Sequence, residues 1–167
     1  LWNFKFEFDS QPGYQKMNKE NKLVPGLPSG FEDRWENKLL LKKKLLKAIE
    51  NNFIKFGAEP LETPSFEISE NIGSFLAEDE ANPMSDVFSF QDGEKSITLR
   101  YDLSSPLARF VAQNNQELPS IFKRYQIQNV FRNEKAGNGR YREFMQADFD
   151  IVGNVDQAQA NAELCNL

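Results

Sequence analysis

The sequence of 167 residues has no histidine and only one cysteine, Cys165. Without histidine it lacks a Ser-His-Asp triad, a Cys-His pair and any imidazole metal ligand. A single cysteine excludes a disulfide within the chain and is typical of a reducing compartment, so we expect a cytoplasmic protein. Cys165 is interpreted as a small buried residue near the chain end. The sequence has no apolar run of about 18 residues, so we expect no membrane span.

Positive charge is in deficit as well. The 20 Lys and Arg residues are outnumbered by 25 Asp and Glu residues, which gives a net charge of -5. Such a balance does not predict a general polyanion-binding surface. Contact with nucleic acid would have to come from a local basic patch or from residues outside this chain. Acid–base chemistry would fall to carboxylates, lysine, tyrosine or the substrate.

The two ends of the chain suggest a piece of a larger protein. The chain begins at Leu1, and Met17 precedes a plausible start. We interpret residues 1–17 as a leader or non-native extension and residues 18–167 as one incomplete domain. The final helix, expected from Gln157 to Leu167, has no cap after it and is expected to continue.

A long helix is predicted over residues 34–56, because apolar residues recur every three or four positions. Lysines occupy the opposite face and are expected to face solvent. Gly57 follows directly and suits the left-handed conformation that ends many helices. We expect the apolar stripe to be buried against another element; it consists of Leu41, Leu45, Leu46, Ile49, Phe53 and Phe56.

Residues 58–66 form an extended segment that contains Pro60 and Pro64. Because proline donates no backbone hydrogen bond, this segment is expected at a sheet edge or an interface. Residues 70–85 are predicted to be a polar loop with a helical turn.

Short strands are predicted over residues 87–90 and 96–100, around a hairpin signal at Asp92-Gly93. A helix is expected from Ser105, with Pro106 in its first turn. Helices interleaved with hairpins, rather than a regular β-α-β repeat, predict an α+β domain.

Two longer strands, over residues 122–132 and 140–152, are joined by the loop 133–139 and carry the most informative residues. Alternate residues of a strand share a face. One face of the second strand therefore carries Phe144, Gln146, Asp148 and Asp150. The other carries Met145, Ala147, Phe149 and Ile151 and is expected to be core.

Basic residues gather at the turn between these strands. Guanidinium groups bind phosphate oxygens bidentately, and an aromatic ring such as Phe144 offers a base a surface for stacking. Without a ligand the loop would only concentrate positive charge. The turn therefore predicts a site for a nucleoside triphosphate; its basic residues are Arg132, Lys135, Arg140 and Arg142.

These stretches resemble the class II aminoacyl-tRNA synthetases. Phe131-Arg132-Asn133-Glu134, a loop and Arg140-x-x-x-Phe144 resemble their motif 2, and the helix with the segment around Pro64 resembles motif 1. Residues 99–104 (Leu-Arg-Tyr-Asp-Leu-Ser), residues 139–144 (Gly-Arg-Tyr-Arg-Glu-Phe) and Gln146-x-x-x-Asp150 are similar to the histidyl-tRNA synthetase family in particular. The resemblance covers residues 27–167. It implies an antiparallel sheet flanked by helices, with motif 3 and the anticodon-binding domain beyond Leu167.

The resemblance also implies a role for each matching residue. Arg132 would be catalytic, holding the α-phosphate of ATP and the histidine carboxylate. Glu134 would read the adenine amino group, Phe144 would stack on the ring, and Arg140 would hold the outer phosphates with Mg²⁺. The histidine α-amino group and ring would be bound by Asp102, Ser104, Gln146 and Asp150. No protein metal ligand is implied, and Asp148 receives no role.

One residue departs from the family pattern, since Ser104 stands where the family usually has threonine. The hydroxyl is kept and one methyl group is lost, worth about 0.8 kcal/mol at most. The implied activity is that of a histidine–tRNA ligase, which joins L-histidine to tRNA(His) at the expense of ATP. A homodimer through residues 34–66 is also implied.

Three alternatives remain open from the sequence. The first is the synthetase-like regulatory subunit of ATP phosphoribosyltransferase, which binds histidine as a sensor. The second is another class II synthetase, such as the prolyl or threonyl enzyme. The third is a binding module with a basic loop, which would require all three stretches to match by coincidence.

Overall fold

The structure, a computed structural model, describes residues 25–76 and 87–167. The leader expected over residues 1–17 lies outside the described residues. Helices and strands are interleaved as predicted, and the α+β class is confirmed. The elements are α1 (Glu36–Lys55), β1 (Glu59–Pro60), β2 (Phe66–Ile68), α2 (Ser69–Leu76), β3 (Ser89–Asp92), β4 (Lys95–Leu99), α3 (Ser104–Asn114), β5 (Ile121–Phe131), β6 (Glu143–Gly153) and α4 (Gln157–Cys165).

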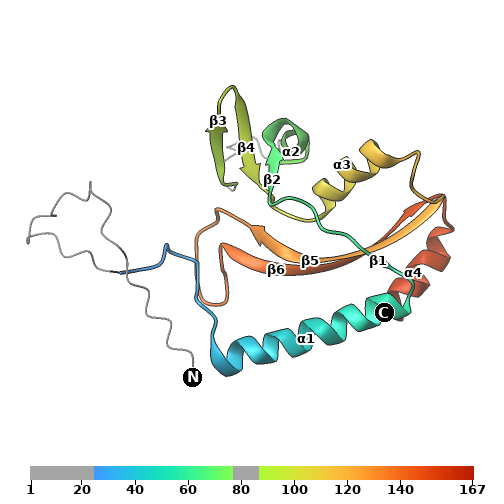
Figure 1. The fold of residues 1–167 in the computed structure, drawn as a ribbon, viewed down its shortest axis with the longest axis horizontal. Helices are drawn as coiled ribbons and strands as arrows, with labels where there is room; N and C mark the ends of the chain where they lie inside the picture. Colours follow the sequence, from blue (N-terminus) through green and yellow to red (C-terminus); the bar gives the residue numbers. More distant parts are fainter. Residues whose placement is uncertain (1–24, 77–86) are drawn as a thin grey trace, which may run out of the picture.

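The long antiparallel hairpin of β5 and β6 is the platform on which the other elements pack (Figure 1). Its eleven-residue register pairs Ile121 with Gly153 at one end and Phe131 with Glu143 at the other. The second strand begins three residues later than predicted, because Gly137 and Arg140 form a bridge within the turn. The strand β1 joins β5 in parallel at the edge of the sheet, as the prolines of that segment predict.

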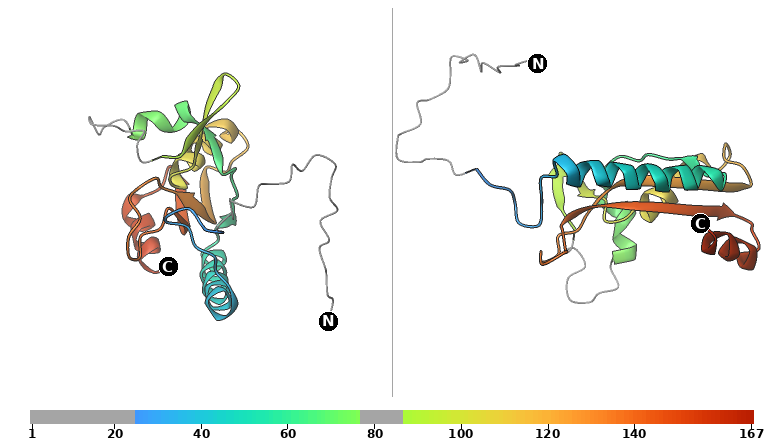
Figure 2. Two further views of the ribbon diagram at one scale, coloured as in Figure 1. Left: turned by 90° about the vertical axis from the view of Figure 1, so that its left-hand side faces the viewer. Right: turned by 90° about the horizontal axis from the view of Figure 1, so that it is seen from below.

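The helix α1 runs along one face of this hairpin (Figures 1 and 2). Phe53 packs on Tyr125 and Phe149, with ring centres 5.8 and 5.6 Å away. Within the predicted stripe Phe53 is buried, and Leu46, Ile49 and Phe56 are half-buried. Leu41 and Leu45 are 69% and 59% exposed, so the prediction of a fully buried stripe is wrong for the N-terminal half.

The same face of β6 is only partly core. Phe149 belongs to the buried cluster around Phe53, but Ala147 is exposed and Met145 and Ile151 are half-buried. One helix is too narrow to cover a three-stranded sheet, so part of the predicted core face stays uncovered within the described part of the chain.

The opposite face of the hairpin lies under α3 and the second sheet, whose order is β2-β4-β3 (Figure 1). Phe110 of α3 packs on Phe122 of β5. The predicted turn at Asp92-Gly93 is present, and Gly93 has a φ of 62°, which glycine adopts without strain.

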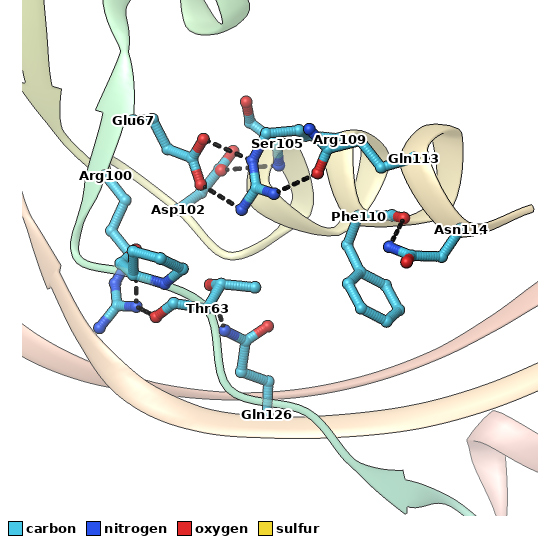
Figure 3. A network of polar contacts seen from close by, with 11 residues as sticks. Thr63, Glu67, Arg100, Asp102, Ser105, Arg109, Phe110, Gln113, Asn114 and Gln126 are labelled. Atoms are coloured by element: carbon cyan, nitrogen blue, oxygen red, sulfur yellow. Dashed lines mark hydrogen bonds and ion pairs between the residues drawn. The ribbon is translucent and has the colours of Figure 1, made fainter.

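The segment 70–85 differs from its prediction, because α2 is a helix of eight residues rather than a single turn in a loop. The rest of that segment lies outside the described residues. Buried Glu67 accepts two hydrogen bonds from Arg109 of α3, at 2.7 and 2.8 Å, which ties β2 to α3 (Figure 3).

The helix α4 follows β6, with Asp156 as a side-chain N-cap. Cys165 ends this helix and is exposed, so its interpretation as a buried residue is wrong. Within the described residues, no helix combines the length and apolarity that a membrane crossing requires.

Candidate functional site

The face of the hairpin opposite α1 carries the predicted site residues. The register places Val130 opposite Phe144, Gln128 opposite Gln146, Gln126 opposite Asp148 and Arg124 opposite Asp150. Since alternate residues share a face, these four pairs form one surface, which is polar apart from Val130 and Phe144. Arg132 follows at the turn end of the same face.

At the turn end, this surface is hollowed. A pocket of about 280 Å³ is lined by Arg132, Glu134, Gly139, Arg140, Tyr141 and Phe144. The structure thus brings all four predicted ATP-binding residues together. The guanidinium of Arg132 lies 5.0 Å from the ring centre of Phe144 and 4.4 Å from that of Tyr101. Two aromatic rings therefore orient this arginine.

Glu134 is held by its neighbours. The Tyr101 hydroxyl donates to Glu134 Oε1 at 3.0 Å, and Arg140 forms an ion pair with Glu134 Oε2. Burial raises the pKa of the Glu134 carboxyl, but hydrogen bonds from Tyr101 and Arg140 outweigh it, so the net shift is downward. Glu134 is therefore ionised and fixed in the pocket.

Two basic residues of the turn do not line this pocket. Arg142 donates from Nε to the Glu134 carbonyl, and its backbone N–H donates to the Gly30 carbonyl. Lys135 is exposed. Four basic side chains were predicted to converge, and two of them, Arg132 and Arg140, line the pocket. Arg142 instead hydrogen-bonds to the backbone of the turn.

Farther along the same face, Asp150 forms an ion pair with Arg124, with Nη2 2.7 Å from Oδ2. The Arg124 side chain is fully buried and that of Asp150 is 34% exposed. Burial lowers the pKa of the Arg124 guanidinium, while the charges of Asp150, Asp148 and Asp102 oppose that shift. Three carboxylates thus surround one buried cation.

Asp148 and Gln146 lie between this ion pair and the pocket. Burial raises the pKa of the Asp148 carboxyl, Arg124 opposes the rise, and Asp150 and Asp102 add to it. The Oε1 atom of Gln146 is buried without a hydrogen-bond partner among the described residues. Both side chains can therefore accept from, or donate to, a ligand on this face.

Asp102 and Ser104 approach the same face from the start of α3. Asp102 Oδ1 accepts a hydrogen bond from the backbone N–H of Ser105 at 3.1 Å and so caps the helix (Figure 3). Ser104 is exposed in the first turn. Leu103 between them is fully buried, and its carbonyl accepts from Arg124 at 3.3 Å. The segment is thereby tied to the polar surface.

Sequence reasoning missed two residues of this site, Tyr101 and Arg124. Tyr101 lies within the stretch 99–104, next to Asp102, and an aromatic residue beside a predicted ligand was the available signal. Arg124 is an arginine at an inward position of a predicted strand, which is costly unless the charge is paired. The pairing strand was predicted, but the register that would name the partner was not.

Among residues 25–76 and 87–167, no group of three or more Asp, Glu, Cys or His side chains is placed to hold a metal ion. What the site offers is a pocket with two guanidinium groups and an aromatic ring, continuous with a surface rich in carboxylates. This arrangement suits an anion bearing a planar group beside a cation or N–H donor.

Comparison with known proteins shows which family the chain is similar to. A family model described as Histidyl-tRNA synthetase matches residues 30–167. The chain is 80% identical to the histidine--tRNA ligase of Pelagibacter ubique (strain HTCC1062) over 151 residues, which are 90% of this chain and 32% of that protein. It is 44% identical to the histidine--tRNA ligase of Rhodopseudomonas palustris (strain BisB18) over 152 residues, covering 90% of this chain and 29% of that protein. The chain therefore spans about a third of the length of these curated relatives.

Solved structures resemble the fold. A histidyl-tRNA synthetase from Nostoc sp. PCC 7120 matches with a TM-score of 0.67 and 29% identity, over 84% of this chain and 32% of that one. A protein from Bacillus halodurans, titled an ATP phosphoribosyltransferase regulatory subunit/histidyl-tRNA synthetase, matches with a TM-score of 0.72 and 21% identity, over 87% of this chain and 38% of that one. At that identity the second likeness concerns the fold alone.

Proposed function

Because this chain belongs to the histidyl-tRNA synthetase family, we propose that it contributes motifs 1 and 2 to the catalytic domain of a histidine–tRNA ligase. The reaction activates L-histidine with ATP to histidyl-adenylate and pyrophosphate, and then transfers the histidyl group to tRNA(His). The observation that carries the proposal is the position of Arg132, which lies where the pocket meets the carboxylate-rich surface.

In the first step, an oxygen of the histidine carboxylate attacks the α-phosphorus of ATP, and pyrophosphate leaves with the bond electrons. Arg132 would contact both the carboxylate and the α-phosphate and stabilise the negative charge that accumulates between them. No protein nucleophile is needed, so catalysis rests on positioning and electrostatics. This suits a chain that has no histidine.

The nucleotide would occupy the pocket at the turn. Phe144 would stack on adenine, and Glu134 would accept from its amino group. Arg140 would hold the outer phosphates, and Mg²⁺ would enter with ATP as part of the substrate. Binding requires the Arg140–Glu134 ion pair to open; the Arg140 side chain is 66% exposed, and such surface pairs are worth only about 0–1 kcal/mol.

The amino acid would lie on the carboxylate-rich surface. Asp102, Ser104 and Gln146 would bind its α-ammonium group, and Asp150 would accept from the imidazole N–H. An unpaired carboxylate is costly when a ligand lacks the matching donor, and sites built in this way can reject such analogues by roughly 10⁴-fold. The surface thereby provides selectivity for histidine.

A histidine-dependent exchange of pyrophosphate into ATP by the natural full-length protein tests this function. We expect exchange with L-histidine and not with proline or threonine. Histidine binding without exchange would instead favour the regulatory subunit of ATP phosphoribosyltransferase. That alternative has less support, because the relatives at 80% and 44% identity are named histidine--tRNA ligases.

We also propose a cytoplasmic homodimer formed through residues 34–66. Support comes from α1, where Leu41 and Leu45 are more than half exposed. Apolar side chains grouped in this way favour a protein partner. Sedimentation of the full-length protein at micromolar concentration should give a dimer, and replacing Leu41 and Leu45 by Lys should yield monomers; a wild-type monomer would contradict the proposal.

A further inference from the structure

Arg124 has no role in the function proposed so far, although it belongs to the polar surface and lies opposite Asp150. Its side chain is fully buried, and it is the fourth residue of β5. Removing a guanidinium from water costs several kcal/mol unless it is paired and hydrogen-bonded. An apolar residue would fill this strand position at no such cost, so what Arg124 contacts is informative.

The first contact is Asp150, which lies directly opposite Arg124 in the hairpin register. Its Oδ2 atom is buried against Arg124 Nη2 at 2.7 Å. The Asp150 side chain is nevertheless 34% exposed. Because Oδ2 is buried, that exposure belongs to the other side-chain atoms, of which only Oδ1 is polar. Arg124 therefore fixes one carboxylate oxygen and leaves the other to meet a ligand.

The second contact is the loop before α3. Arg124 Nη2 donates to the carbonyl of Leu103, which is flanked by Asp102 and Ser104. One guanidinium therefore joins the strand residue proposed to bind the imidazole to the segment proposed to bind the α-ammonium group. Arg124 is thereby one of the buried contacts that set the distance between these two ligand sets.

The third contact anchors Arg124 itself. Its Nη1 donates to Gln126 Oε1 at 3.1 Å. Gln126 Nε2 in turn donates to Thr63 Oγ1 at 2.8 Å (Figure 3). Gln126 is fully buried and Thr63 is buried. A buried hydrogen-bonded chain therefore runs from the segment after β1 to Asp150, and it restricts the rotamers of each member.

We propose that Arg124 is a positioning residue for the amino-acid substrate, which holds Asp150 so that Oδ1 accepts from the imidazole N–H at a fixed distance from Asp102. The proposal rests on the proposed function, since it takes histidine to be the ligand of this surface. Asp102, Asp148 and Asp150 carry three negative charges against one positive charge of Arg124. The excess suits a ligand that brings an ammonium group and an N–H donor.

The test measures pyrophosphate exchange by the natural full-length protein and its Arg124→Lys and Arg124→Gln variants. Lysine keeps the charge and loses the forked geometry that reaches both Asp150 and Leu103. We expect the KM for histidine to rise about 10- to 100-fold, as for loss of a hydrogen bond to a charged group. The KM for ATP should change less than threefold, because the pocket residues keep their contacts.

Selectivity supplies a readout that general destabilisation does not move. Discrimination between histidine and β-(2-thienyl)alanine, whose ring has no N–H, should fall at least tenfold in both variants. As a matched control, Arg109→Lys disturbs another arginine paired with a buried carboxylate, Glu67, away from this surface. It should lower thermal stability and leave both the KM for histidine and the discrimination unchanged.

A double variant keeps the test decisive if single Arg124 variants fail to fold. Arg124→Gln with Asp150→Asn removes both charges of the ion pair, so neither partner of that pair is left buried without the other. If Arg124 acts through Asp150, adding Arg124→Gln to Asp150→Asn raises the KM for histidine less than threefold. A further tenfold rise, or single variants with equal changes in both KM values, would overturn the positioning role. A wild-type protein without histidine-dependent exchange would instead refute the proposed function.

Discussion

Arg132 and Tyr101 contact each other twice: the guanidinium lies 4.4 Å from the ring centre, and Nε donates to the Tyr101 carbonyl at 3.4 Å. Phe144 packs on the same guanidinium at 5.0 Å. The arginine is therefore oriented by groups on two different segments before any substrate binds. Preorganised charge of this kind accounts for much of the rate enhancement of enzymes.

Replacing Arg132 should therefore affect the chemical step more than binding. In Arg132→Lys the charge is kept, but the fork that would bridge carboxylate and phosphate is lost. We expect kcat of histidine-dependent pyrophosphate exchange to fall about 100- to 1000-fold, as when one donor to a developing oxyanion is removed. Unchanged kcat in steady-state exchange would exclude a role in the transition state.

Phe144 and Phe149 lie on opposite faces of β6 and form a matched pair. Phe144→Leu should raise the KM for ATP about 5- to 100-fold, because stacking on a base is worth about 1–3 kcal/mol. The KM for histidine should not change.

Phe149→Leu is the control, since Phe149 packs on Phe53 of α1 rather than lining the pocket. It should lower the melting temperature and leave the KM for ATP unchanged. Equal effects of the two substitutions on ATP would contradict the assignment of the nucleotide pocket.

Asp150→Asn should weaken histidine binding by about 10- to 100-fold, because a hydrogen bond to a charged group contributes about 1.5–3 kcal/mol. ATP binding should change less than threefold. Titration calorimetry of each ligand separately measures both affinities, and Asp156→Asn, at the start of α4, serves as control. Equal loss of both affinities would count against Asp150 as the imidazole acceptor.

Asp148 should make stability depend on pH. In the unfolded chain its carboxyl loses the proton near the usual pKa of about 3.9, whereas burial raises the pKa in the folded state. Between these two values the folded state binds more protons, so the free energy of unfolding falls as pH rises through that window.

Asp148→Asn removes the free-energy cost of holding an ionised carboxylate at this half-buried position. The variant should melt at a higher temperature than the wild type at pH 7, and the difference should shrink as pH falls towards 4. Thermal unfolding of both proteins at pH 4, 5.5 and 7 measures the difference. A difference that is largest at pH 4 would show that Asp148 is not the destabilising group.

The ion pair between Glu67 and Arg109 should contribute more to stability than a pair in solvent. The Glu67 side chain is 4% exposed and that of Arg109 is 23% exposed. Glu67→Gln should lower the free energy of unfolding by about 1–3 kcal/mol, because the hydrogen bonds from Arg109 lose their buried, charged acceptor.

Lys47 and Glu50 provide the comparison, since the Lys47 side chain of this pair is 65% exposed. Lys47→Gln should cost less than about 0.5 kcal/mol. Urea denaturation of the wild type and both variants gives the three values. Equal costs would mean that burial of Glu67 does not strengthen the pair.

The sequence by itself determined where the long helix and the last hairpin lie and which side chains of β6 share a face. Periodicity gives these features because strand and helix geometry fix which neighbours point the same way. The resemblance of residues 27–167 to a synthetase family then assigned roles to the matching positions. Neither source named Arg124, because its inward position in the strand indicates a paired charge but does not identify the partner.

The register of the hairpin was decided by the tertiary structure. Strands with the predicted bounds would pair Arg132 with Arg140 and would place Phe122 opposite Asp150. The structure pairs Phe131 with Glu143 and so brings Arg124 opposite Asp150. A shift of two residues keeps every side chain on its face, which is why the predicted face is right although the partner was missed.

Tertiary structure also decided which apolar residues are buried. The period of α1 is the same along its length, yet Phe53 is buried and Leu41 is exposed. Burial depends on what lies opposite each side chain: Phe53 packs on Tyr125 and Phe149 of the sheet, whereas Leu41 stays 69% exposed. Local periodicity records which face is apolar, and only the packing of other elements determines how far along the helix that face is covered.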